Sequence, residues 1–216
     1  MKGLRLALAC SMGVASLAWA GEPAKPAVLP AGKPTMPAVP EGMSPEQMKH
    51  MEHAMKNMMP GTEHAQLGQL VGEWNARTSV KMVEGQPPMV SEGTCTITSV
   101  HEGRFIHLED SGEMMGMPFK SGKIMGFNNA SKKYESVWTY TMGTSMMVLS
   151  GTSKDGGKTI DMVGKYEDSA EMGGVQTMRI AIKIESKDSF TMETTHEPSP
   201  SHPAGGSMST VYTRKK

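Results

Sequence analysis

The sequence has little cysteine, few aromatic residues and no excess of either charge. Its 216 residues include two cysteines, and only 5% are aromatic. The 22 basic residues balance the 22 acidic ones, whereas nucleic-acid binders usually gather an excess of Lys and Arg on one face. We therefore expect no nucleic-acid partner. The length is that of one modest globular domain with appendages.

Long hydrophobic runs are absent beyond the N-terminus. There, a short basic start precedes an apolar stretch, Leu6 to Leu17, and Ala18-Trp19-Ala20 offers the small residues at which signal peptidase cleaves. We expect residues 1–20 to be a signal peptide rather than a membrane span, so that a mature periplasmic or secreted protein begins at Gly21. The alternative is a lipoprotein anchored through Cys10, but the leucine expected three residues before that cysteine is missing.

Cys95 is then the single cysteine of the mature chain, so no intramolecular disulfide is expected. Its neighbours Thr94, Thr96 and Ile97 are typical of a strand. No Cys or His lies in local register to lower the pKa of the thiol, which favours a buried, inert cysteine.

Proline recurs throughout residues 21–43, a composition that favours a disordered, extended leader. Helical signals follow over residues 44–71. Ser44 is a good N-cap, Gln47 completes a capping box, and Pro60-Gly61 ends the helix. A second short helix is expected to begin at Thr62.

Methionine is the compositional anomaly, with 23 residues. On the predicted helix, Met48, Met51, Met55, Met58 and Met59 fall within an arc of about 100°. Such thioethers can line an adaptable cavity, scavenge oxidants or bind Cu(I).

The weak metal candidates are Met51, Met55 and Met58, because His50 and His53 lie outside the arc. The alternative to a metal site is that this helix docks on the domain or on a second copy of the chain, giving a homo-oligomer.

From residue 72 onward, alternating segments separated by short turn signals predict strands. The first is residues 72–82. The others are Met89–Val100, Arg104–Asp110, Phe119–Phe127, Tyr134–Thr141, Met146–Thr152, Thr159–Tyr166, Val175–Ser186, Ser189–His196 and Ser209–Lys215. Short connections favour antiparallel pairing, and closure removes exposed edges. The prediction for residues 72–216 is therefore an all-β fold, an antiparallel up-and-down β-barrel of about ten strands preceded by one or two short helices, with a sandwich as the alternative.

Several motifs resemble those of the bacterial family called domain of unknown function 1579, over roughly residues 62–216. They are Gly72-Glu73-Trp74, Gly103-Arg104-Phe105, Gly112 to Phe119, Lys132-Lys133-Tyr134, Trp138, Met142-Gly143-Thr144 and Val211 to Lys216. The resemblance implies a secreted, lipocalin-like barrel and no agreed activity. It also implies a structural role in barrel closure for Trp74, packed under Arg214.

A closed barrel of this size would enclose a cavity unless side chains fill it. Trp138 and Tyr140 share one strand face, and Phe105, His107 and Glu109 share another; inward orientation of these faces would line the cavity. Met114-Met115-Gly116-Met117-Pro118 is interpreted as a hairpin that gates it. The predicted ligand-binding residues are Phe105, His107, Met114, Met115, Met117, Trp138 and Tyr140.

Signatures of enzymes are absent from the sequence, including a Gly-x-Ser-x-Gly elbow, a phosphate loop and a His-Glu-x-x-His pair. The acidic residues Glu109, Asp110 and Glu113 are interpreted as solvated, and His107 and His196 as structural. No catalytic residue and no cofactor is predicted. The favoured function is non-catalytic binding of a small apolar or amphipathic molecule; the alternatives are methionine-based copper or oxidant handling and a structural or interaction module.

Overall fold

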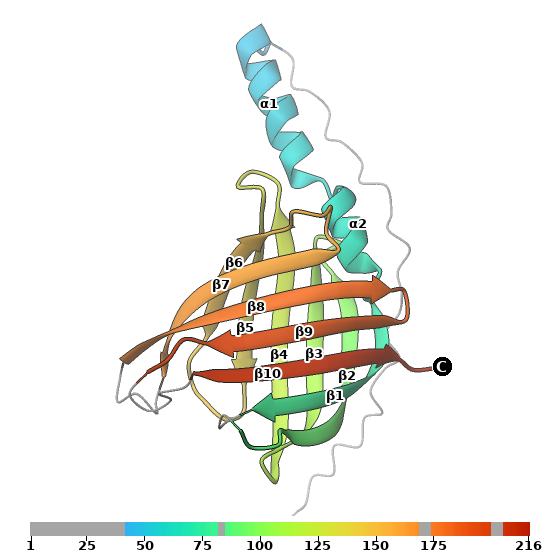
Figure 1. The fold of residues 1–216 in the computed structure, drawn as a ribbon. Coiled ribbons are helices and arrows are strands. Elements are labelled where there is room, and N and C mark those ends of the chain that lie inside the picture. The colour runs from blue at the N-terminus through green and yellow to red at the C-terminus, as the bar shows by residue number, and fades with distance from the viewer. Residues whose placement is uncertain (1–41, 82–84, 169–173, 200–204) are drawn as a thin grey trace, which may run out of the picture.

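The computed structural model describes residues 42–81, 85–168, 174–199 and 205–216. The expected signal peptide and the leader up to residue 41 lie outside the described residues. Within them the chain forms two helices, α1 (Pro45–Met58) and α2 (Thr62–Gly68), and ten strands (Figure 1). The strands are β1 (Gly72–Lys81), β2 (Met89–Val100), β3 (Phe105–Met114), β4 (Met117–Asn128), β5 (Lys133–Tyr140), β6 (Met147–Thr152), β7 (Thr159–Asp168), β8 (Gly174–Ser186), β9 (Ser189–His196) and β10 (Gly206–Arg214).

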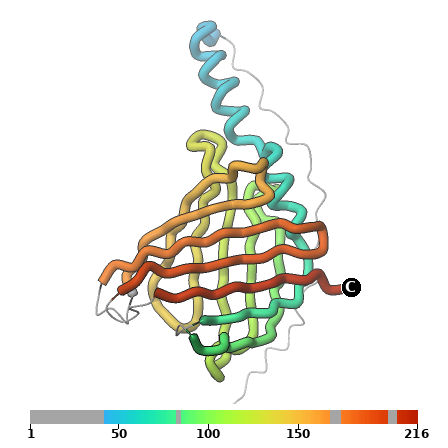
Figure 2. Tube along the Cα trace, in the orientation of Figure 1, coloured from blue at the N-terminus to red at the C-terminus, as the bar shows by residue number. Residues whose placement is uncertain are grey.

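The ten strands close into an antiparallel up-and-down barrel (Figures 1 and 2). Each strand pairs with its sequence neighbours, and β1 also pairs with β10, so that Trp74 lies opposite Cys95 on one side and Arg214 on the other. Closure gives every strand two partners and leaves no edge open to another chain. The predicted barrel of about ten strands is confirmed, and the alternative of a sandwich is wrong.

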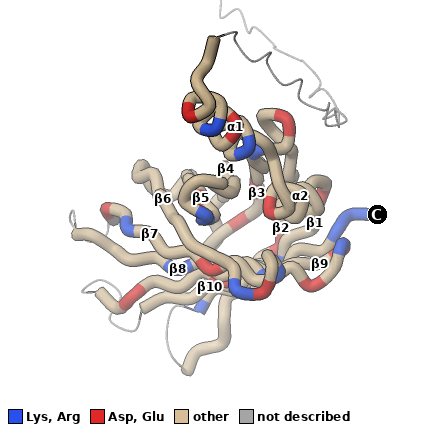
Figure 3. The backbone as a smooth tube through the Cα atoms, turned by 90° about the horizontal axis from the view of Figure 1, so that it is seen from above, with Lys and Arg blue, Asp and Glu red and all other residues tan. Residues whose placement is uncertain are grey.

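Alternation of side chains along each strand builds the core inside the barrel. In β8, Met178, Ile180 and Ile182 are buried, whereas Arg179 and Lys183 point outward and are exposed. This period of two is what one buried face and one solvated face require. Basic and acidic residues are interspersed along α1 and the barrel strands (Figure 3), in keeping with the balanced charge of the chain.

Trp74 and Arg214 close the end of the barrel next to α2. The indole is 0% exposed, its Nε1 donates to the Leu70 carbonyl at 2.9 Å, and the Arg214 guanidinium lies 4.1 Å from the ring centroid. Arg214 also donates to the carbonyls of Val71 (2.9 Å) and Gln69 (2.8 Å). One side chain thus covers the indole and satisfies backbone acceptors just after α2. This is the placement that the family resemblance implied.

Helix α1 begins as predicted, with a capping box in which Ser44 and Gln47 bond each other's backbone N–H. None of its residues is buried, and the helix projects away from the barrel (Figure 2). Near its C-terminal end, hydrogen bonds join it to the barrel: Arg104 donates to the Met58 carbonyl, and Asn129 donates to the carbonyls of Asn57 and Met59. Neither described helix is long and apolar enough to cross a membrane.

Candidate ligand cavity

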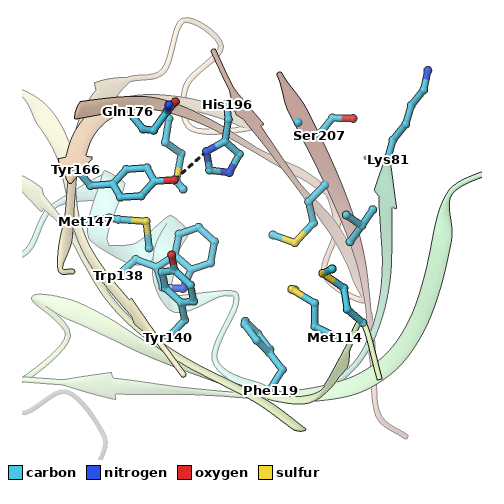
Figure 4. Close-up of a pocket in the computed structure, with 15 residues that line it drawn as sticks. Lys81, Met114, Phe119, Trp138, Tyr140, Met147, Tyr166, Gln176, His196 and Ser207 are labelled. Atoms are coloured by element: carbon cyan, nitrogen blue, oxygen red, sulfur yellow. Dashed lines mark hydrogen bonds between the residues drawn. The ribbon is translucent and has the colours of Figure 1, made fainter. Parts of the chain in front are cut away.

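A cavity of about 210 Å³ lies inside the barrel at the end opposite α2, where β1 ends and β10 begins. Its wall comes from strands all around the barrel (Figure 4). The lining residues are Val80, Lys81, Met114, Met115, Phe119, Trp138, Tyr140, Met147, Tyr166, Gln176, Met178, His196, Gly206, Ser207 and Met208. The inward positions of the strands therefore do not fill this end of the barrel.

One wall of the cavity is aromatic. Trp138 and Tyr140 point inward from β5, with ring centroids 5.9 Å apart, and Phe119 joins them from β4 (Figure 4). Five methionines complete much of the apolar lining: Met114, Met115, Met147, Met178 and Met208. Flat rings and flexible thioethers together form a surface that adapts to apolar ligands of varied shape.

Three polar side chains of the cavity lie on the wall formed by β7, β8 and β9. Tyr166 and His196 face each other there, with the phenol oxygen 3.2 Å from Nδ1 of the imidazole (Figure 4). Gln176 on β8 is buried beside them. A mainly apolar pocket with a few polar groups on one side is the usual form of a small-molecule site.

A second, smaller cavity of about 40 Å³ adjoins the first and contains a buried ion pair. Nζ of Lys123 lies 3.0 Å from Oδ2 of Asp110, and their side chains are 6% and 11% exposed. Ser121 donates to the same oxygen at 2.9 Å, and Tyr212 donates to Oδ1 at 3.0 Å. The Lys123 ammonium also lies 4.3 Å from the centre of the Trp138 ring.

The charges of this network fix the protonation states around it. Burial alone would raise the pKa of Asp110, but the charge of Lys123 and the hydrogen bonds from Lys123, Ser121 and Cys95 outweigh it, so that the pKa lies below its usual value. Burial, followed by the negative charge of Asp110, raises the pKa of the Cys95 thiol and of Tyr212. Asp110 is therefore a carboxylate, while Cys95 is a buried, protonated thiol as expected.

Four of the seven predicted ligand-binding residues line the larger cavity: Met114, Met115, Trp138 and Tyr140. The hairpin interpretation also agrees with the structure, since Met115 and Gly116 form the turn between β3 and β4 with positive φ. Met117, however, is exposed and lies outside the cavity wall.

The inward orientation considered for Phe105, His107 and Glu109 is wrong. On β3 it is Ile106 and Leu108 that are buried, while Phe105 is 39% exposed. Phe105 pairs with Gly126 of β4, and its ring occupies the space that a side chain there would take. Because Gly126 has no side chain, the Phe105 ring packs over its backbone on the outside of the barrel.

Asp110 corrects a second expectation, because it is buried in the ion pair rather than solvated. Sequence reasoning missed its partner Lys123 altogether. The available signal was strand alternation: Lys123 shares a face with Phe119 and Met125, so a lysine stands where β4 is otherwise directed inward.

The methionine stripe of α1 lies apart from both cavities. Met58 is 67% and Met48 43% exposed, and Met51 and Met55 are partly exposed. Among the described residues, no group of three or more His, Cys, Asp or Glu side chains is arranged to hold a metal ion.

Three solved structures of low sequence identity are similar to this chain. Rv2717c from M. tuberculosis is 14% identical and has a TM-score of 0.50, with 73% of this chain and 100% of that chain covered. The S-type phycobiliprotein lyase CPES from Guillardia theta is 12% identical and has a TM-score of 0.45, with 73% of this chain and 99% of that chain covered. A redesigned beta barrel, b11L5F_LGL, is 12% identical and has a TM-score of 0.38, with 70% of this chain and 96% of that chain covered.

At 14% identity, the match to Rv2717c indicates a similar fold and nothing beyond it. No curated protein matches the chain. Residues 59–214, which include α2 and the whole barrel, match the family described as "Protein of unknown function (DUF1579)", and the chain belongs to that family.

Proposed function

We propose that the barrel binds a small apolar or amphipathic molecule without catalysing its conversion. The observation that carries the proposal is the 210 Å³ cavity with aromatic and thioether walls and polar groups on one side. A dry cavity of about 150 Å³ holds benzene, so by proportion this one suits a molecule of about eight or nine heavy atoms. The fold shared with other barrels agrees with an interior site but does not identify a ligand.

Filling the cavity tests this proposal. In Met208→Trp, the larger side chain would occupy the cavity from β10, whereas Val211→Trp places the same indole on the exposed outer face of that strand. We expect calorimetric titration with cumene, an apolar probe of nine heavy atoms, to show binding to the wild type and to the Val211 variant. Loss of binding in the Met208 variant alone supports the proposal, and equal affinity in all three proteins contradicts it.

We also propose that the protein acts outside the cytoplasm, as a periplasmic or secreted protein, after removal of residues 1–20. The support is the N-terminal sequence, with its basic start, apolar stretch and Ala18-Trp19-Ala20 site. Cell fractionation followed by mass spectrometry of the intact protein tests this. A mature chain that starts at Gly21 is expected, and full-length protein retained in the cytoplasm contradicts the proposal.

A second candidate function is soft-metal or oxidant handling by α1, favoured by the exposure of its methionines and their separation from the core. Met51, Met55 and Met58 share one face of the helix and would supply thioether ligands for Cu(I). Titration with Cu(I) should give submicromolar affinity that is lost when the three are replaced by leucine. Affinity weaker than micromolar in the wild type would rule out the metal site.

A further inference from the structure

The two cavities share four lining residues and therefore lie next to each other. Met114, Phe119, Trp138 and Met208 line both. The larger cavity is mostly apolar, whereas the smaller one is lined by Lys123, Asp110 and Ser121. A molecule that fills the larger cavity would therefore direct one end towards a buried charged network.

The ammonium group of Lys123 has N–H donors available at that point. Its ammonium group carries three N–H bonds. One is directed to Asp110 at 3.0 Å, and the face of Trp138, 4.3 Å away, receives the charge without accepting a conventional hydrogen bond. Among the described residues, Asp110 is the only hydrogen-bond acceptor for Nζ of Lys123. A buried ammonium group is stabilised when its remaining N–H bonds find an acceptor.

The surroundings of Lys123 favour a neutral acceptor over an anionic one. Asp110 already compensates its charge, with its Oδ2 3.0 Å from Nζ of Lys123. A ligand carboxylate would bring a second negative charge close to the Asp110 carboxylate and would have to lose its own hydration. A carbonyl oxygen accepts the N–H bond without that repulsion, and about 40 Å³ is the space of roughly one water molecule or one such group.

We propose that the smaller cavity is a carbonyl-binding subsite, in which Nζ of Lys123 donates a hydrogen bond to a neutral carbonyl oxygen of a ligand whose apolar part occupies the larger cavity. Trp138 lines both cavities, so its ring would contact the apolar part of the ligand. The Lys123 ammonium group packs over the same ring. This inference rests on the proposed function and narrows the ligand class to neutral ketones, aldehydes, esters or amides with a compact apolar body.

Three probes of nine heavy atoms separate the alternatives in the full-length wild-type protein by isothermal titration calorimetry. Acetophenone has the carbonyl oxygen, cumene replaces the acetyl group by an isopropyl group with the same heavy-atom connectivity, and benzoate carries a carboxylate. Burial of apolar surface alone favours cumene, because acetophenone must shed water from its oxygen. The subsite reverses that order, and we expect acetophenone to bind about tenfold tighter than cumene, with benzoate weakest.

Variants then assign the donor. The double variant Asp110→Asn with Lys123→Met removes both charges together and keeps an acceptor for Ser121 and Tyr212, so no buried charge is left unpaired. It should lose the preference for acetophenone while still binding cumene. Lys183→Met is the matched control, because Lys183 lies on the outer face of β8 and pairs with Glu193. It should behave as the wild type does.

The outcomes distinguish this inference from the function on which it rests. Binding of cumene as tightly as acetophenone to the wild type overturns the subsite and leaves the apolar cavity intact. Benzoate as the tightest ligand overturns the assignment to neutral carbonyls. Preference for acetophenone that persists in the double variant removes Lys123 from the subsite. If none of the three probes binds the wild type, the proposed function itself fails.

Discussion

Replacing Lys123 by methionine should destabilise the barrel far more than an ordinary lysine substitution. The side chain would become one heavy atom shorter and lose its charge, and Asp110 would remain as a buried carboxylate, 11% exposed, with only uncharged donors around it. Removal of one partner from a buried ion pair costs about 3–5 kcal/mol, because the other charge loses its compensation.

The contact between Lys123 and the Trp138 ring adds to that cost, by about 0.5–2 kcal/mol for a desolvated pair. Part of the loss is offset when Asp110 takes up a proton, since its pKa would no longer be held down by the ammonium group. We therefore take about 3–5 kcal/mol as the expected loss. In a chain of this size that lowers Tm by about 10 °C.

Unfolding in guanidinium chloride, followed by tryptophan fluorescence, measures this loss as a change in midpoint at constant slope. The double variant Asp110→Asn with Lys123→Met should recover most of the stability, because neither charge is then left unpaired. Lys183→Met on the outer face should change the free energy of unfolding by less than about 1 kcal/mol. A Lys123→Met protein within 1 kcal/mol of the wild type, or a double variant no more stable than the single one, would refute the reasoning.

Three further predictions concern other parts of the barrel. Because the folded pKa of Asp110 lies below its unfolded value, the stability contributed by the pair is present above about pH 4 and is lost as the pH falls through the folded pKa. The free energies of unfolding of the wild type and of Asp110→Asn, measured by denaturation, should therefore become equal at low pH. A difference between them that stays constant with pH would contradict this. Gly72 has a φ of +142° and a Cβ there would meet Arg214, so Gly72→Ala should cost about 2–4 kcal/mol of unfolding free energy, unlike Gly68→Ala, where space is open. Alkylation mapped by mass spectrometry should leave the buried Cys95 unmodified in the folded protein and label it after unfolding; rapid labelling in native buffer would show that this part of the barrel opens.

The strands and their closure were predictable because both depend on local pattern. Alternation in segments such as β8 identifies the buried face, and short turns between successive segments leave only antiparallel pairing between neighbours. Closure then follows from the cost of open edges rather than from any one residue. The capping box at Ser44 is likewise complete within four residues of sequence.

The walls of the cavity were only partly predictable, because both faces of some strands carry apolar side chains. On β5 the inward face holds Tyr134, Trp138 and Tyr140, so the aromatic wall was identified. On β3, Phe105 looks like a lining residue until its cross-strand partner is known to be Gly126. That partner depends on the register between strands, which composition and periodicity do not determine.

The ion pair was hidden for a related reason. Asp110 and Lys123 lie on adjacent strands, 13 residues apart, and Asp110 is directly opposite Ser121 rather than Lys123. In sequence, each resembles a solvated charge near a hairpin. Only the barrel, which turns both inward, makes them partners and places them beside Trp138.

The abundance of methionine has two separate physical meanings in this chain. Inside the barrel, Met125, Met162 and Met192 are buried core residues, and other methionines line the cavity, where flexible thioethers can adapt to ligands of varied shape. On α1 none of the methionines is buried and none belongs to the core, so packing in the barrel does not account for them. The high methionine content therefore has two separate explanations, one for the barrel and one for α1. A function argued from the cavity and a function argued from α1 are independent of each other, and each can fail without affecting the other.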